Sequence, residues 1–186
     1  GPLHSAASPK PGFIPMTPQN NHQNLILDRP QIEQKITRMA YEIYERNFEE
    51  QELVLAGINQ NGYALAEKLA SHLQRVSPLK VQLLRVSLEK NAPLQRPVEL
   101  QPAEISLEGR AVVLVDDVLN TGKTLAYTLN SFLPQNPKKV EVATLVDRHH
   151  PLFPIAATYT GYSLATTLND RVQVVLQENE VAAYLL

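Results

Sequence analysis

Cysteine is absent from this chain of 186 residues, which excludes disulfides, thiolate metal sites and cysteine nucleophiles. Long apolar runs are absent too. No stretch approaches the ~20 apolar residues that span a bilayer, and the N-terminal stretch lacks the apolar segment of roughly 7–15 residues that a secretory leader needs. A formal net charge of −2 indicates no broad basic surface for nucleic acid or lipid. We therefore expect a soluble, cytoplasmic protein that does not bind membranes.

Residues 1–24 differ in composition from the rest of the chain. Prolines recur through this stretch and would interrupt regular structure; they are Pro2, Pro9, Pro11, Pro15 and Pro18. Over the whole chain, apolar residues make up 44% and charged residues 19%, a balance typical of globular domains. We expect a flexible tail over residues 1–24 and a single folded domain over residues 25–186.

Helical and strand patterns alternate through that domain. Asp28 is placed to cap a helix, with Gln31 completing a capping box, and the periodic stretches 63–76 and 124–133 predict further helices. Short apolar runs predict strands; these are residues 53–58, 79–88, 111–115, 140–146, 158–160 and 172–176. The alternation favours an α/β fold with a mostly parallel sheet flanked by helices, which the last two strands complete. Residues 89–103 show no periodicity and predict a long loop.

The segment of residues 112–124 carries most of the functional information. A buried strand delivers Asp116 and Asp117 to its carboxyl end, the edge at which ligands bind in parallel sheets. A turn then opens a helix, where Gly122 lets the backbone approach a ligand and the free N–H groups of the helix N-terminus face an anion. Thr121 and Thr124 can add hydroxyl donors to a phosphate, whereas the carboxylates can accept hydrogen bonds from a diol. The pattern therefore suits a phosphorylated sugar.

Two other interpretations fit parts of this segment. Gly122-Lys123-Thr124 matches the end of a nucleotide-triphosphate P-loop, but that motif requires a glycine where Asp117 stands, and carboxylates would repel polyphosphate. Alternatively, the segment is a plain strand, turn and helix in which Asp117 or Thr121 serves as a cap. The full pattern of residues 112–124 favours the phosphorylated sugar over both.

Residues 112–124 resemble the phosphoribosyl-pyrophosphate signature of type I phosphoribosyltransferases. Other stretches resemble the bifunctional pyrimidine operon attenuator/uracil phosphoribosyltransferase family; they are residues 27–28, 37–43, 56–58, 145–148 with His150, and 159–167. The resemblance covers residues 25–186 and implies the type I phosphoribosyltransferase fold, with a small hood built from residues near the C-terminus. It also implies an enzyme that moves phosphoribose from phosphoribosyl pyrophosphate to a nucleobase, and the expected base is a pyrimidine such as uracil. The expected ligands are phosphoribosyl pyrophosphate with the nucleobase, or the nucleoside monophosphate.

The resemblance implies a role for each matching residue. Asp116 and Asp117 would be catalytic and bind the ribose hydroxyls, while the 5-phosphate would contact Asn120, Thr121, Gly122, Lys123 and Thr124. The pyrophosphate loop would contain Gln60, Asn61 and Gly62. Lys90 would lie at the base of a lid over residues 89–103, and the base would face Asp147, Arg148, Thr166 and Thr167. Mg²⁺ would bridge the substrate's hydroxyls and pyrophosphate, without a site built from protein side chains alone, although Asp116 and Asp117 could approach it.

The resemblance breaks at two places. The attenuator family carries Thr-Arg-Gly in the pyrophosphate loop, where this chain has Gln60-Asn61-Gly62. Asparagine offers neutral hydrogen bonds in place of an arginine fork, which is a strong oxyanion ligand. The lid begins Glu89-Lys90 in place of the family's Tyr-Arg-Asp-Asp-like start. Because both changes weaken pyrophosphate handling, the alternative function is a catalytically weak or inactive regulator that binds a nucleotide or phosphoribosyl pyrophosphate.

Two further partners follow from the family, and the sequence treats them differently. Attenuators bind RNA, but here the isoelectric point is about 6.2 and Lys138-Lys139 is the only adjacent basic pair, so RNA binding is not expected. A homodimer is expected, and the apolar residues 181–186 predict a terminal strand or a dimer contact. His149-His150 lacks a third metal ligand placed by sequence, so a loop position near the base pocket is predicted for this pair.

Overall fold

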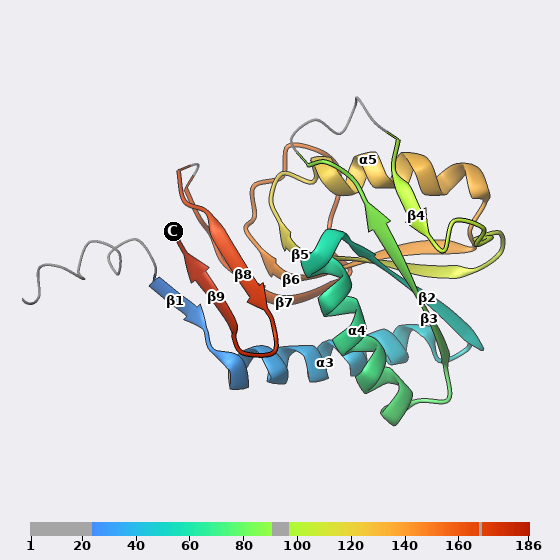
Figure 1. Ribbon diagram of the computed structural model, residues 1–186, viewed down its shortest axis with the longest axis horizontal. Helices are drawn as coiled ribbons and strands as arrows, with labels where there is room; N and C mark the ends of the chain where they lie inside the picture. The colour runs from blue at the N-terminus through green and yellow to red at the C-terminus, as the bar shows by residue number, and fades with distance from the viewer. Residues whose placement is uncertain (1–23, 91–96, 168) are drawn as a thin grey trace, which may run out of the picture.

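The computed structural model describes residues 24–90, 97–167 and 169–186, which fold into two sheets (Figure 1). The larger sheet has six strands in the order β4-β3-β2-β5-β6-β7, and the smaller has three in the order β1-β9-β8. The larger sheet consists of β2 (Glu52–Ile58), β3 (Lys80–Ser87), β4 (Glu99–Gln101), β5 (Ala111–Leu119), β6 (Lys139–Asp147) and β7 (Tyr159–Ser163). The predicted tail over residues 1–24 lies outside the described residues, except for Asn24.

The larger sheet is parallel apart from one edge. Strands β2, β3, β5, β6 and β7 pair in parallel, and β4 pairs with β3 antiparallel. The predicted α/β fold is therefore confirmed. The strand β4 corrects the prediction of an unstructured loop over residues 89–103, of which residues 91–96 lie outside the described residues. The three residues of β4 are too few to show a strand's alternation of apolar and polar side chains. Their pairing with residues 85–87 of β3 is a tertiary contact, which the local sequence does not reveal.

Helices cover both faces of this sheet. The helices α3 (Arg29–Asn47) and α4 (Asn59–Val76) lie on one face, and α5 (Lys123–Phe132), followed by a 3₁₀ turn over Leu133–Gln135, lies on the other (Figure 1). The capping box of α3 is confirmed, since the Asp28 carboxylate accepts from the Gln31 backbone at 3.0 Å and the Gln31 side chain accepts from the Asp28 backbone at 2.9 Å. None of these helices is both long and apolar enough to cross a bilayer.

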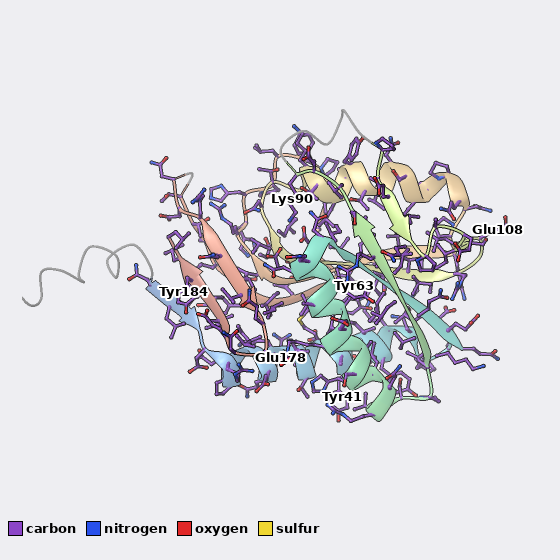
Figure 2. The ribbon with its side chains drawn as sticks, viewed as in Figure 1. Tyr41, Tyr63, Lys90, Glu108, Glu178 and Tyr184 are labelled. Atoms are coloured by element: carbon purple, nitrogen blue, oxygen red, sulfur yellow. The ribbon has the colours of Figure 1, made fainter. Side chains whose placement is uncertain are left out.

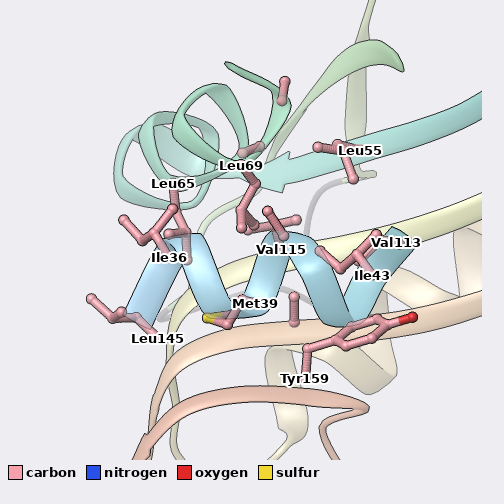
Figure 3. Close-up of a cluster of buried hydrophobic side chains, with 14 of the residues drawn as sticks. Ile36, Met39, Ile43, Leu55, Leu65, Leu69, Val113, Val115, Leu145 and Tyr159 are labelled. Carbon is pink, nitrogen blue, oxygen red and sulfur yellow. The ribbon is translucent and has the colours of Figure 1, made fainter. Parts of the chain in front are cut away.

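The core is divided by the alternation of side chains along the central strands. Val113 and Val115 of β5 join a buried cluster with α3 and α4, in which Met39 and Tyr159 also lie (Figure 3). Val112 and Leu114 point to the other face and pack with residues of α5. Because a strand has a period of two, this packing fixes the direction in which the residues after Val115 point.

The smaller sheet forms the hood. It consists of β1 (Asn24–Leu27), β8 (Val172–Leu176) and β9 (Val181–Leu185), all antiparallel. The prediction that residues 172–176 complete the main sheet is wrong, because β8 pairs with β9 through a hairpin in which the Gln177 backbone donates to the Glu180 carbonyl at 2.8 Å. The apolar C-terminus is a terminal strand, as predicted, and it lies between β8 and the N-terminal β1.

Candidate functional site

The two adjacent carboxylates lie in the last part of β5 and are held by its backbone. The side chain of Asp116 is 3% exposed and that of Asp117 is 14% exposed. One Asp116 oxygen accepts from the Asp117 backbone N–H at 2.9 Å, and Asp117 Oδ1 accepts from the Val118 N–H at 2.9 Å. Both predicted catalytic residues therefore sit at the carboxyl end of the central strand with fixed orientations.

Lys90 lies against this acidic pair. Its Nζ is 3.2 and 3.3 Å from the two Asp116 oxygens and 3.9 Å from Asp117 Oδ1. Burial raises the pKa of Asp116 well above its ordinary value, and the Lys90 ammonium opposes that rise. Burial also opposes the charge of Lys90, but the two carboxylates outweigh it and raise the lysine's pKa. The predicted lid residue is thus a partly exposed cation beside the acidic pair, on the side of the molecule where α5 lies (Figure 2).

The predicted phosphate turn links β5 to α5. Gly122 adopts a left-handed φ of +91°, and an added Cβ would lie 3.2 Å from the Ile155 Cβ and 3.3 Å from the Phe153 carbonyl oxygen. The Thr121 carbonyl accepts from the backbone N–H groups of Leu152 and Phe153 at 3.0 and 3.1 Å. The turn is therefore supported from outside by residues 152–155, and its helix N-terminus remains available to an anion.

One pocket brings Asp116, one of the two predicted ribose residues, together with the predicted phosphate residues. Its lining includes Lys90, Asp116 and all five residues of the turn, Asn120, Thr121, Gly122, Lys123 and Thr124. The end of β5, the Lys90 ammonium and the N-terminus of α5 thus border the same space. This is the arrangement expected if a diol meets the carboxylates while its phosphate meets the turn.

The predicted pyrophosphate residues lie in the first turn of α4, because that helix starts at Asn59 and not at the predicted Tyr63. Asn59 has a left-handed φ of +55°, and its side chain accepts from the Leu88 backbone at 3.1 Å. A Cβ on Gly62 would lie 2.6 Å from the Val115 carbonyl, so α4 packs directly against β5. Because asparagine tolerates left-handed backbone better than most residues, Asn59 directly after a buried strand could have indicated this earlier start.

Asn61, which is expected to replace an arginine of the attenuator family, has its side-chain amide hydrogen-bonded within the protein. Its Nδ2 donates to Asp117 Oδ2 at 3.0 Å and to the Val174 carbonyl of β8 at 2.8 Å. A second pocket is lined by Asn59, Gln60 and Asn61 together with Ile58, Lys90 and Asp117. Gln60 and Asn61 therefore share a pocket with Asp117, and Lys90 is the cation in its lining.

Arg148, which is predicted to face a base, connects the phosphate turn to the loop after β7. Its Nη1 donates to Asn120 Oδ1 at 2.8 Å, and its Nε donates to Thr166 Oγ1 at 3.0 Å. Its Nη2 donates to the carbonyls of Thr167 and Asp170 at 3.1 and 2.5 Å. Thr166 and Thr167 are thus both brought to Arg148, and this guanidinium orders the loop of which they are part.

A third pocket lies beside the phosphate turn, on the side of Asp147. It shares Leu119, Asn120 and Thr121 with the first pocket; its other lining residues are Asp147, His149, His150, Pro151, Ile155, Ala156 and Ala157. The Asp147 carboxylate accepts from the His149 backbone at 2.9 Å, and His150 Nε2 donates to the Thr166 carbonyl. Asp147 and the two histidines therefore line one space adjoining the ribose-phosphate pocket.

The described residues offer no ready-made metal centre. Across residues 24–90, 97–167 and 169–186, no group of three or more His, Cys, Asp or Glu side chains is placed to hold a metal ion. Asp116 and Asp117 are nevertheless hard oxygen donors at the edge of a pocket. Mg²⁺ is usually held by one or two carboxylates together with substrate phosphates and waters, so this donor pair fits Mg²⁺ arriving with a phosphorylated ligand.

Comparison with known proteins assigns the family. The model of the phosphoribosyl transferase domain matches residues 22–178. The chain belongs to the phosphoribosyltransferase family. A relative named "Bifunctional protein PyrR" from Pelotomaculum thermopropionicum is 37% identical over 163 residues, covering 82% of this chain and 88% of the relative. Its namesake from Enterococcus faecalis is 34% identical over 164 residues, covering 84% of this chain and 92% of the relative. The family resemblance predicted from residues 112–124 is confirmed.

Solved structures of other phosphoribosyltransferases share the fold. The hypoxanthine phosphoribosyltransferase of Trypanosoma cruzi superimposes with a TM-score of 0.73 at 18% identity, covering 88% of this chain and 95% of that chain. A hypoxanthine-guanine phosphoribosyltransferase from Bacillus anthracis gives a TM-score of 0.69 at 20% identity, covering 88% of this chain and 98% of that chain. At such identities the likeness establishes the architecture of the phosphoribosyltransferase fold and not the base.

Proposed function

We propose that this phosphoribosyltransferase moves phosphoribose from phosphoribosyl pyrophosphate to a nucleobase, a pyrimidine such as uracil. One observation carries the proposal: Asp116, the phosphate turn and Lys90 line one pocket, and Asp117 and Lys90 line a second pocket together with Asn61. A ligand with phosphate at one end, a diol in the middle and pyrophosphate at the other fits this order. The relatives named "Bifunctional protein PyrR" support the pyrimidine.

The chain's own residues would perform three tasks on such a ligand. The backbone N–H groups of residues 121–124 and the hydroxyls of Thr121 and Thr124 bind the 5-phosphate. Asp116 and Asp117 accept hydrogen bonds from the ribose hydroxyls. With both ends of the sugar held, the anomeric carbon has a fixed position relative to an incoming base nitrogen, and this positioning supplies much of the rate.

The chemical step is the displacement of pyrophosphate from the anomeric carbon. A bond forms from the base nitrogen to that carbon while the bond to the pyrophosphate oxygen breaks, through a cationic, oxocarbenium-like sugar. The carboxylates of Asp116 and Asp117, held beside the sugar, would stabilise this developing positive charge. Lys90 lies 3.2 Å from Asp116 and in the lining of the neighbouring pocket, within reach of the departing anion.

Mg²⁺, which fits the oxygen donors of Asp116 and Asp117, would neutralise pyrophosphate charge when bound with the substrate. Since Lys90 is the partner of this pair in the ligand-free protein, binding of a cation there requires the ammonium to move. The released ammonium would then be free to contact the pyrophosphate.

The reaction itself provides the test. Pyrophosphate release is measured with phosphoribosyl pyrophosphate, Mg²⁺ and each nucleobase in turn. The proposal predicts release that depends on uracil and matches the formation of UMP. Release with a purine base alone would overturn the pyrimidine assignment, and no release with any base would favour the second candidate.

That second candidate is a regulator that binds a nucleotide and turns over slowly. The observation in its favour is that Asn61 has no positive charge and that its amide already donates hydrogen bonds to Asp117 and to the Val174 carbonyl. Loss of one charge-assisted contact costs about 1.5–3 kcal/mol, or roughly one to two powers of ten in affinity for pyrophosphate. Paired titrations with Mg²⁺ distinguish the candidates, because a regulator should bind UMP more tightly than phosphoribosyl pyrophosphate.

RNA attenuation is less well supported. Several basic side chains outside the pockets are paired with carboxylates; these pairs include Arg38–Glu42, Arg46–Glu141 and Lys138–Glu50. Ion pairs of this kind reduce the net charge available to RNA phosphates. The homodimer and the cytoplasmic location stay predictions.

A further inference from the structure

The amide of Asn61 joins two parts of the molecule that are far apart in sequence. Its acceptors are Asp117 Oδ2 on β5, at 3.0 Å, and the Val174 carbonyl on β8, at 2.8 Å. The first acceptor belongs to the ribose-binding pair of the large sheet, and the second belongs to the hood. A single NH₂ group therefore bridges the catalytic strand and the hood.

Only a side chain that offers two hydrogen-bond donors at short reach can make this bridge. The NH₂ of asparagine has two hydrogens that diverge, and the first turn of α4 that carries it is held against β5 by the close approach of Gly62 to the Val115 carbonyl. Aspartate has the same shape but no donor at neutral pH, and leucine has neither donor nor acceptor. The bridge thus depends on the amide itself.

The bridge also completes the hold on the Asp117 carboxylate. Asp117 Oδ1 accepts from the Val118 backbone at 2.9 Å and lies 3.9 Å from Lys90. Among residues 24–90, 97–167 and 169–186, the Asn61 amide is the one hydrogen-bond donor to Oδ2. Without it, the carboxylate would keep one anchored oxygen and could rotate about that anchor.

We propose that Asn61 is a positioning residue: it sets the orientation of Asp117 for a ribose diol and makes that orientation depend on the docked position of the hood. This inference rests on the proposed function, since it takes the acidic pair as the diol site. It also gives the departure from the family's arginine a role, because the asparagine amide contacts both the ribose-binding pair and the hood. The affected ligands are those that carry a 2′,3′-diol.

The test compares a ligand that has the diol with one that lacks it. UMP and 2′,3′-dideoxyuridine monophosphate are titrated onto the parent protein, Asn61→Leu and Asn61→Asp, each checked for folding by circular dichroism. Because hydrogen bonds to charged groups are involved, both variants should lose about tenfold in affinity for UMP. Affinity for the dideoxy ligand should stay within about twofold of the parent value, since that ligand makes no bond to Asp117.

A matched control separates the hood from the carboxylate. Arg29 Nη2 donates to the Glu178 carbonyl at the tip of the β8–β9 hairpin, at 3.0 Å, so Arg29→Met removes a tie to the hood without touching Asp117. Hydrogen exchange should rise in β8 and β9 in both Asn61→Leu and Arg29→Met. Selectivity for the diol should fall in the Asn61 variants alone.

The outcomes are distinguishable. Equal losses for both ligands in the Asn61 variants would show a general structural role and overturn the proposal, as would unchanged affinity for UMP. If the parent protein does not prefer UMP to the dideoxy ligand, the acidic pair is not a diol site and the proposed function fails first. If Asn61→Leu does not fold, the near-isosteric Asn61→Asp decides alone.

Discussion

Gly122 is the residue at which backbone strain and ligand approach coincide. Its φ is +91°, and an added Cβ would press on Ile155 and on the Phe153 carbonyl. Gly122→Ala should therefore destabilise the protein by about 1–2 kcal/mol from the left-handed backbone alone. It should also displace the turn from residues 153–155 and weaken binding of UMP. Urea unfolding and calorimetric titration measure the two effects.

Gly109 offers a matched control for this prediction. It has a left-handed φ of +68° with nothing within 4 Å of an added Cβ, and it contributes to none of the pockets beside β5. Gly109→Ala should cost similar stability and leave UMP affinity unchanged. If Gly122→Ala binds UMP as tightly as Gly109→Ala does, the phosphate is held elsewhere.

For single residues, the sequence predicts site residues that are close together along the chain, but it does not predict contacts that form only when distant segments pack. Asp116 and residues 120–124 lie close together in the sequence, so a strand-turn-helix pattern was enough to bring them to one pocket. Asn61 and Asp117 are separated by 56 positions, and Lys90 and Asp116 by 26. Nothing in the local pattern around Lys90 indicates that its ammonium contacts the carboxylates, because the sheet order creates that contact.

Among the elements, the segment after β3 carries the cation that competes for the acidic pair. Removing the ammonium in Lys90→Met should let the ligand-free protein bind Mn²⁺, used as a probe for Mg²⁺, about tenfold more tightly. The control is Lys80→Met, which removes the same charge from an exposed residue at the opposite end of β3. Mn²⁺ titration by electron paramagnetic resonance reads the difference. Equal changes in both variants would show that only net charge matters.

The loop after β7 depends on Arg148, whose guanidinium bonds reach Asn120, Thr166, Thr167 and Asp170. Arg148→Lys keeps the charge but cannot reproduce the fork. We expect UMP affinity to fall about tenfold and amide exchange to rise over residues 164–167. Mass-spectrometric hydrogen exchange and calorimetry provide both readings.

Arg38 serves as the control for Arg148. It also bonds carbonyls through its guanidinium, those of Gly161 at 2.6 Å and Thr160 at 3.3 Å, but it lies on α3. Arg38→Lys should reduce stability without changing UMP affinity. An equal loss of affinity in both variants would mean that the contacts of Arg148 are only structural.

The elements themselves were predicted where the pattern was long. The helix α3 has a capping box and a sustained apolar face, and both appear in the structure. The start of α4 was missed because Asn59, Gln60 and Asn61 are polar, whereas the helix there is stabilised by the contact of Gly62 with β5. The strand β8 was assigned to the wrong sheet, since its apolar sequence says nothing about its partner.

For the molecule as a whole, the hood is joined to the body by apolar packing and by two polar contacts. Leu27, Val174, Leu176, Val181 and Ala183 belong to the buried cluster that includes α3 and α4. The Asn61 amide donates to β8, and the Arg29 guanidinium donates to the hairpin carbonyl of Glu178. Because β1 also belongs to the hood, this sheet brings together segments from both ends of the folded domain. Composition and motif predicted the family and the main sheet, whereas the smaller sheet depends on contacts between distant segments.

The central claim is that Asp116 and Asp117, with the turn after them, form a ribose 5-phosphate site. The most direct test is calorimetric titration of UMP onto the parent protein and onto the double variant Asp116→Asn with Asp117→Asn. The account predicts that the parent binds UMP and that the folded double variant binds it about a hundredfold or more weakly, because two charged acceptors are lost. Unchanged affinity in the folded double variant would contradict it.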